Sequence, residues 1–237
     1  DGGGGFGKRD SDTSGLGDWF VNEEKLKGGL NTLVEKVKSY GMKFGIWFEP
    51  EMVSEDSELY RTHPEWAIQI PNRKPTRSRY QLVLDMTRQD VRDYLFKVIS
   101  DVLSSADISY VKWDMNRSIC DWYSAALPVE NMGEMQHRYV LGLYELLDRL
   151  TSEFPHILFE GCSGGGGRFD AGILYYCPQI WCSDDTDAYE RTKIQYGTSF
   201  FYPISTIGSH VSIVPNHQTG RITPFETRAV TAMSGSF

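Results

Sequence analysis

The sequence predicts an α/β fold in which helices cover a parallel β-sheet. Candidate helices and short strands alternate along the whole chain, and the strands are apolar at nearly every position. Polar residues gather directly after the strands. The 237 residues are close to the length of a single α/β barrel, about 250 residues. We therefore predict one domain over residues 1–237.

Five segments have the features of helices. In the first, Asn22 can cap the opening turn and Gly41 suits the end. Thr87 and Asp90 form a variant capping box before the second, which then shows one apolar stripe at helical spacing. The third carries a similar apolar face. The expected helices cover residues 22–41, 88–106, 132–152, 188–200 and 226–235.

The expected strands lie between these helices, at residues 43–51, 109–114, 156–163, 180–184 and 202–210. Each of the first four ends in polar residues: Glu49 and Glu51, Asp114 and Asn116, Glu160 and Cys162, Asp184 and Asp185. In a barrel the active site lies at the carboxyl ends of the strands, so this pattern favours a barrel. A doubly wound open sheet is the alternative, but it usually gathers its ligand at one switch point.

Bulk composition excludes several functions. The net charge of -8 disfavours nucleic-acid binding, because an acidic surface repels phosphate backbones. No apolar run is long enough to span a membrane, and no secretory signal is expected. The four cysteines show no C-x-x-C spacing, which indicates free thiols in a reducing, cytoplasmic compartment. Aromatic residues make up 13% of the chain, as in clefts where rings stack on sugars.

The motif YVKWDMNR at residues 110–117 is the first candidate site. Residues two apart on a strand share a face, so Lys112, Asp114 and Asn116 can point the same way. A lysine beside Asp114 would hold the carboxyl group ionised, as a nucleophile requires. An ordinary buried ion pair is the competing interpretation.

The motif WCSDDTDA at residues 181–188 is the second. Three acids within four residues raise one another's pKa, which can leave one carboxyl group protonated and able to act as an acid. A metal site competes with this hypothesis, although the Gly and Glu offsets of an EF-hand loop are missing. A turn or helix cap built from Asp and Thr is the plainest interpretation.

Two glycine runs and one tryptophan motif complete the set. EGCSGGGGRFD at residues 160–170 permits close backbone approach, whereas neither a dinucleotide site nor a serine-hydrolase elbow fits it. The opening DGGGGFGKR lacks the hydroxyl residue of a P-loop. GIWFEPEM at residues 45–52 suits the rim of a sugar-binding cleft, because a Trp is followed by two carboxylates. Two carboxylates on separate strands, one ionised and one protonated, are the working parts of a glycosidase.

In order along the chain, the motifs FGKRDSD, LGDW, GIWFEPEM, YVKWDMNR, EGCSGGGGRFD, CSDDTDA and AMSGSF resemble those of the family 36 glycoside hydrolases, the bacterial α-galactosidases. The resemblance implies a (β/α)8 barrel and a retaining mechanism with Asp114 as nucleophile and Asp184 as general acid/base. It further implies a homo-oligomeric parent enzyme that needs no cofactor or metal. The residues that it places against galactose are Trp47, Arg79, Lys112, Asn116, Cys162 and Gly164.

The chain departs from the family pattern at its ends. Gly2 and Gly3 stand where the family has two acids that hold galactose hydroxyl groups, and Gly5 stands where it has a tryptophan. Two lost charged hydrogen bonds at about 1.5–3 kcal/mol each predict weak galactose binding. The barrel is expected to be truncated in its first and last strands, with open edges.

Retaining chemistry needs carboxyl groups about 5 Å apart, so we expect neighbouring strand ends to supply Asp114 and Asp184. Three functions remain open at this point. The first is an α-galactosidase acting on galactosides such as melibiose and raffinose. The second is an α-N-acetylgalactosaminidase or galactosyl transferase of the same barrel, for which the loop around Cys162 would decide. The third is an inactive sugar-binding fragment.

Overall fold

The structure is a computed structural model that describes residues 4–236. It divides into two compact units. The first comprises the residues up to Val111 together with Met115–Ile157, and the second comprises Lys112–Asp114 together with the residues from Leu158 onward. The predicted replacement of two acids by Gly2 and Gly3 lies outside the described residues.

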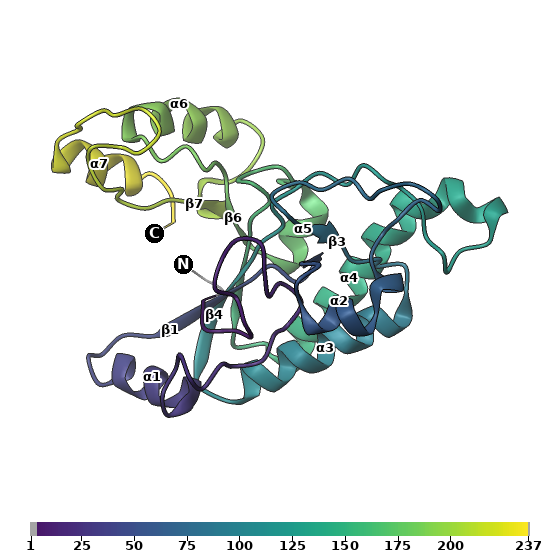
Figure 1. Ribbon diagram of the computed structural model, residues 1–237. Coiled ribbons are helices and arrows are strands. Elements are labelled where there is room, and N and C mark those ends of the chain that lie inside the picture. The colour runs from purple at the N-terminus through teal and green to yellow at the C-terminus, as the bar shows by residue number, and fades with distance from the viewer. Residues whose placement is uncertain (1–3, 237) are drawn as a thin grey trace. The chain divides into compact units, whose positions relative to one another are not determined.

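A pair of long helices forms much of the first unit's core. The helices α3 (Gln89–Ser104) and α4 (Met135–Glu153) lie side by side, as Figure 1 shows. Leu95 and Ile99 on α3, and Leu146 and Leu150 on α4, are completely buried. The two residues on each helix are four positions apart and so lie on one face of that helix. Burying one such side chain contributes about 1.5–3 kcal/mol to the stability of the fold. The sequence prediction of both helices is confirmed.

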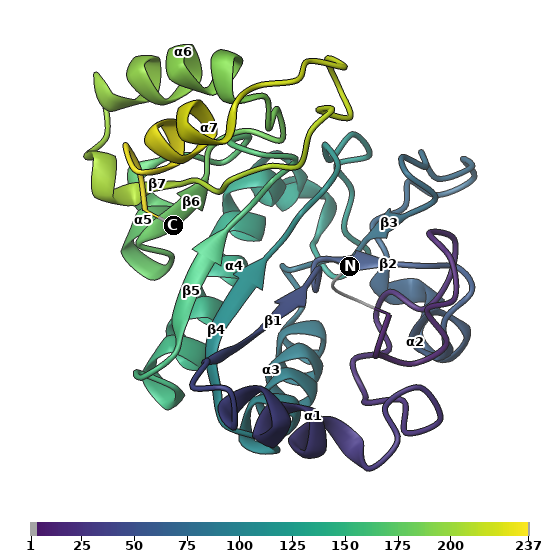
Figure 2. The same ribbon diagram turned by 90° about the vertical axis from the view of Figure 1, so that its left-hand side faces the viewer.

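The sheet portion of the first unit contains β1 (Phe44–Phe48) beside β4 (Ile108–Trp113), and the two strands run in the same direction (Figure 2). The last two residues of β4 belong to the second unit. The helix α1 (Gly29–Lys38) precedes β1 and begins seven residues later than predicted. Gly28 and Gly29 have φ angles of 88° and 76°, which interrupt a helix, so Asn22 caps only an isolated turn.

The first unit also contains short elements that the sequence patterns did not reveal. The capping box predicted from Thr87 and Asp90 at the start of α3 is wrong. Thr87 Oγ1 instead donates to Asp85 Oδ1 at 2.6 Å, and Asp90 accepts from Arg88. The short elements are α2 (Glu58–Thr62), η1 (Pro64–Trp66), η2 (Val129–Glu134) and the antiparallel pair β2 (Met52–Val53) and β3 (Leu82–Val83).

In the second unit, the end of β4 is followed across the sheet by β5 (Leu158–Gly161), β6 (Gln179–Trp181) and β7 (Ile207–Gly208). The pairs β5–β6 and β6–β7 are parallel. The prediction of an α/β chain with a parallel sheet is therefore confirmed.

The helices of the second unit are α5 (Ala171–Tyr176), α6 (Ala188–Ser199) and α7 (Phe225–Ala232). The helices α6 and α7 pack together, and α6 begins at the predicted residue. The predicted strand at 202–210 is largely wrong. Pro203 starts a short 3-10 helix, η3 (Ile204–Thr206), which leaves only two residues to pair in β7.

Candidate active site

Asp114 lies directly after β4, and its side chain is buried. The thiol of Cys162, which follows β5, is hydrogen-bonded to it. Burial raises the pKa of the Cys162 thiol, and the nearby charge of Asp114 raises it further. Cys162 therefore stays a neutral S–H donor and adds no second negative charge beside Asp114.

A lysine provides positive charge to the same cluster. Lys112 Nζ forms an ion pair with Glu160 Oε1 at 3.1 Å, and Glu160 Oε2 also accepts a hydrogen bond from Gln179 at 2.8 Å. Lys112 opposes the rise in the pKa of Cys162 while Asp114 promotes it, so both charged groups lie close to the thiol. The sequence predicted Lys112 beside Asp114, and that pairing stays a prediction, since the ion pair of Lys112 in the structure is with Glu160.

Asp184 is more exposed than Asp114 and lies three residues beyond the end of β6. Its Oδ1 atom accepts a hydrogen bond from the indole Nε1–H of Trp181 at 3.0 Å. Since β5 lies between β4 and β6, the expectation that neighbouring strand ends supply Asp114 and Asp184 is wrong. The two carboxyl groups follow strands that are separated by one intervening strand of the same sheet, so the separation of about 5 Å that retaining chemistry would need has to come from the residues beyond the strand ends.

The second glycine run packs against the turn that carries Asp184. A Cβ atom at Gly165 would lie 2.9 Å from the backbone nitrogen of Asp184, and one at Gly166 would lie 2.6 Å from the carbonyl oxygen of Cys182. Gly165 also has a φ angle of 83°. No other residue fits these two positions without displacing the turn, as the sequence indicated. Gly164 lies at the exposed start of this loop.

The third acid of the WCSDDTDA motif has a structural role. Asp187 caps α6 by accepting from the backbone N–H groups of Tyr189 and Glu190, and it also binds Thr219 and Arg221. Burial by itself raises the pKa of Asp187, but these hydrogen bonds and the charge of Arg221 together hold the pKa below its usual value. The hypothesis that the neighbouring acids raise one another's pKa is therefore wrong for Asp187, and the interpretation of this residue as a helix cap is correct.

The first unit holds the other candidate residues. Trp47 lies in β1 and Asn116 donates its backbone N–H to Glu49 Oε1 at 3.0 Å, so both belong to the carboxyl end of β1. Arg79 is exposed and has a φ angle of 52°, which is unusual for a residue other than glycine.

Arg9 interacts with several of these residues of the first unit. Its guanidinium group lies 5.9 Å from the centre of the Trp47 ring. Burial lowers the pKa of Arg9, and the charge of Arg79 lowers it too, against the opposing effect of Glu49. Arg9 thus lies within electrostatic range of both Glu49 and Arg79. No single-residue signal in the sequence distinguished it from Lys8, the other cation of the FGKRDSD motif.

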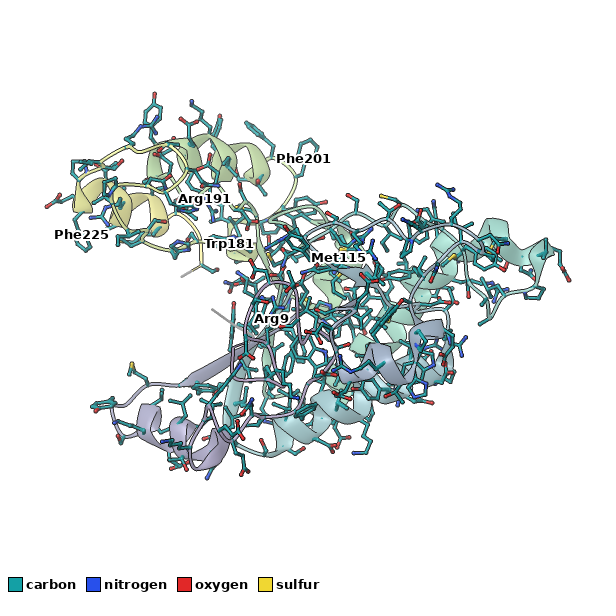
Figure 3. The ribbon with its side chains drawn as sticks, in the orientation of Figure 1. Arg9, Met115, Trp181, Arg191, Phe201 and Phe225 are labelled. Carbon is teal, nitrogen blue, oxygen red and sulfur yellow. The ribbon has the colours of Figure 1, made fainter. Side chains whose placement is uncertain are left out.

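Sequence reasoning also missed Trp181 and Arg191, both buried in the second unit (Figure 3). Lys112 Nζ and Arg191 Cζ lie 4.7 Å and 4.2 Å from the centre of the Trp181 ring. His210 stacks on the same ring at 4.7 Å. The three-residue spacing between Trp181 and Asp184 was the only available signal, since the other contacts join distant segments.

Within residues 4–236, no group of three or more His, Cys, Asp or Glu side chains is placed to hold a metal ion. No helix in this part of the chain is long and apolar enough to cross a membrane.

Comparison with known proteins identifies the family. The sequence profile described as Melibiase matches residues 1–237. The chain belongs to the Melibiase family. It is 62% identical to the bifunctional alpha-galactosidase/sucrose kinase AgaSK of Mediterraneibacter gnavus, over 98% of this chain and 24% of that protein. It is 60% identical to the alpha-galactosidase AgaA of Geobacillus stearothermophilus, over 98% of this chain and 32% of that enzyme.

Solved structures of Melibiase relatives agree. The crystal structure of the GH36 alpha-galactosidase AgaA matches with a TM-score of 0.96 at 59% identity, covering 98% of this chain and 32% of that chain. A variant of AgaA in complex with raffinose matches equally well. The resemblance to family 36 glycoside hydrolases is therefore confirmed. The chain spans between about a quarter and a third of the length of these curated relatives.

Proposed function

We propose that this chain carries the catalytic centre of a retaining α-galactosidase, which removes terminal α-linked galactose from oligosaccharides such as melibiose and raffinose. The arrangement of two carboxyl groups in the second unit supports the proposal most directly. Asp114 is buried beside a neutral thiol donor, whereas Asp184 is exposed and bound to an indole N–H. Two carboxyl groups in such different surroundings suit a nucleophile and an acid/base.

In the proposed reaction, a carboxylate oxygen of Asp114 attacks the anomeric carbon of galactose. The bond from that carbon to the glycosidic oxygen breaks, and the oxygen keeps the electron pair and takes a proton from Asp184. Water then gives a proton to Asp184 and attacks the same carbon, which releases Asp114 from the galactosyl ester. The net result is one glycosidic bond hydrolysed with its configuration retained.

The remaining candidates are proposed to bind the sugar. The ring of Trp47 offers a stacking surface at the carboxyl end of β1. Lys112 and the thiol of Cys162 are hydrogen-bond donors beside Asp114. Arg79, Asn116 and Gly164 complete the set. We further propose that the parallel sheet is part of a (β/α)8 barrel and that the parent enzyme is a homo-oligomer.

The test is hydrolysis of an aryl α-galactoside by this chain and by its Asp114→Asn variant, with circular dichroism to show that both are folded. We expect loss of the nucleophile to lower kcat by about 10⁴-fold or more, because no covalent intermediate can form. Hydrolysis that survives in Asp114→Asn would exclude the assignment. A faster rate on an α-N-acetylgalactosaminide would favour that substrate class instead.

A further inference from the structure

Trp181 is the side chain that holds the proposed acid/base. An indole N–H is a donor and never an acceptor, so the Oδ1 atom that receives it at 3.0 Å acts as an acceptor in either protonation state of Asp184. The C=O oxygen of a carboxylic acid is a better acceptor than its O–H oxygen, so this hydrogen bond favours a proton on Oδ2. The indole thus selects which oxygen of the carboxyl group can give a proton away.

The Trp181 ring is itself fixed by groups from three other segments. His210 stacks on it almost in parallel, at an interplanar angle of 7°, while Lys112 and Arg191 place cations over it. Such cation–ring contacts are favourable and strongest when the pair is desolvated.

Arg191 cannot easily move away from the ring. Its Nε atom donates to the carbonyl of Asp185 at 2.9 Å, and its Nη1 atom donates to Cys182 Sγ and to the carbonyl of Gly208. Its buried Nη2 atom has no hydrogen-bond partner among the described residues, and the guanidinium group lies 4.2 Å from the Trp181 ring centre. The plane of the indole is therefore set by a buried cation that the backbone holds in place.

We propose that Trp181, held by Arg191 and His210, is a positioning residue that directs the Oδ2 proton of Asp184 toward the leaving group. This inference rests on the proposed function. When the glycosidic bond breaks, the O–H bond at Oδ2 breaks too, and Asp184 becomes a carboxylate. The hydrogen bond from Trp181 then has a charged acceptor, and such bonds are about twice as strong as neutral ones. Trp181 thus stabilises the transition state more than the ground state.

The first test is the dependence of the rate on the leaving group in Trp181→Phe. Acid catalysis matters most for a poor leaving group, such as the sugar of raffinose, and least for dinitrophenolate, which needs little protonation. We expect kcat/KM to fall by about 10- to 100-fold on raffinose, the effect of one hydrogen bond to a charged group. We expect a fall of less than about threefold on the dinitrophenyl galactoside.

The pH profile provides a second kinetic measurement. Removing the N–H donor destabilises the carboxylate form of Asp184 relative to the acid form. The basic limb of kcat/KM should therefore move to higher pH in Trp181→Phe. Lys112, Arg191 and His210 contact the Trp181 ring, and Glu160, Asp185 and Cys182 act on Arg191 or His210; the substitution leaves all of these groups in place. Equal losses on both substrates with an unmoved basic limb would reduce Trp181 to a merely structural role and overturn the proposal.

A matched control and an isosteric variant separate function from folding. Trp66→Phe removes a buried indole in the first unit that stacks on His63 and should leave the leaving-group dependence unchanged. If Trp181→Phe does not fold, benzothienylalanine at the same position keeps the bicyclic ring and lacks only the N–H. The proposal requires the same selective loss on raffinose in that variant.

A spectroscopic measurement needs no activity. One of the six tryptophan indole N–H resonances, identified by its absence in Trp181→Phe, should show a pH-dependent step in the wild-type chain that is lost in Asp184→Asn, whereas any step caused by the stacked His210 ring remains in both. A Trp181 resonance that does not respond in the wild type would overturn the inference. Failure of the proposed function is recognised separately, because it would appear as hydrolysis that does not depend on Asp114.

Discussion

The helix pair of the first unit and the strand-end site of the second unit are built from different kinds of contact. The helices α3 and α4 bury apolar side chains such as Leu95 and Leu146. Around β5 and β6, by contrast, Glu160 and Arg191 are buried charges held by specific partners. Apolar packing tolerates small changes, whereas removing one partner of a buried charge leaves the other unsatisfied. Substitutions in the helix pair should therefore lower stability, and substitutions near the site should alter chemistry.

The largest effect on stability is expected for Leu146→Ala in the helix pair. The side chain is completely buried, so its truncation should leave a cavity and lower the free energy of unfolding by about 2–5 kcal/mol. Urea denaturation measures this change. The proposed activity per folded molecule should stay at the wild-type level, and a loss of activity in the folded variant would contradict the comparison between the two regions.

A smaller loss of stability is expected for Asp187→Ala in the second unit. The substitution removes the α6 cap and leaves Arg221 without one of its partners, which together should cost about 1–3 kcal/mol at pH 7. Because the pKa of Asp187 is lowered in the folded state, its contribution is complete above the unfolded value of about 3.9 and is lost as the pH falls below it. The difference between variant and wild type should therefore shrink from pH 7 to pH 3 in urea titrations, and a constant difference would contradict this account.

Gly165→Ala should lower stability by about as much as Asp187→Ala, and it should also have a clear effect on activity. The added methyl group meets the backbone of Asp184 at a φ angle that alanine rarely adopts, which costs about 1–3 kcal/mol. The turn that carries Asp184 should shift, so kcat on raffinose should fall more than kcat on a dinitrophenyl galactoside. Gly133→Ala is the matched control, because nothing lies within 4 Å of its Cβ position. Equal kinetics for the two variants would contradict the proposed role of the glycine loop.

Most of the long elements could be predicted from the sequence, because the helices carry apolar residues at helical spacing and the strands are short apolar runs. The helices α3 and α4 and the strands β1, β4, β5 and β6 all lie within the predicted ranges or extend only a residue beyond them. Errors arose where backbone conformation or local side-chain contacts decided the outcome. Gly28 and Gly29 delayed α1, and Thr87 bonded to Asp85 rather than to the helix.

The candidate site could be predicted only in part. Carboxyl groups at the ends of several predicted strands marked the region, and the resemblance to family 36 then singled out Asp114 and Asp184, whose roles stay a prediction. Trp181 and Arg191 were missed because their roles depend on tertiary contacts with His210 and Lys112, which no local pattern encodes. The strand order placed β5 between the two acids, and this too depends on topology rather than on local sequence.

Covalent labelling tests the central claim most directly. The chain is incubated with a mechanism-based galactosyl inhibitor, digested and analysed by mass spectrometry, with Asp114→Asn as the control. We predict one galactosyl group attached to Asp114 in the wild-type chain and none in the variant. A label on any other residue, or hydrolysis of galactosides without a label on Asp114, would contradict the account.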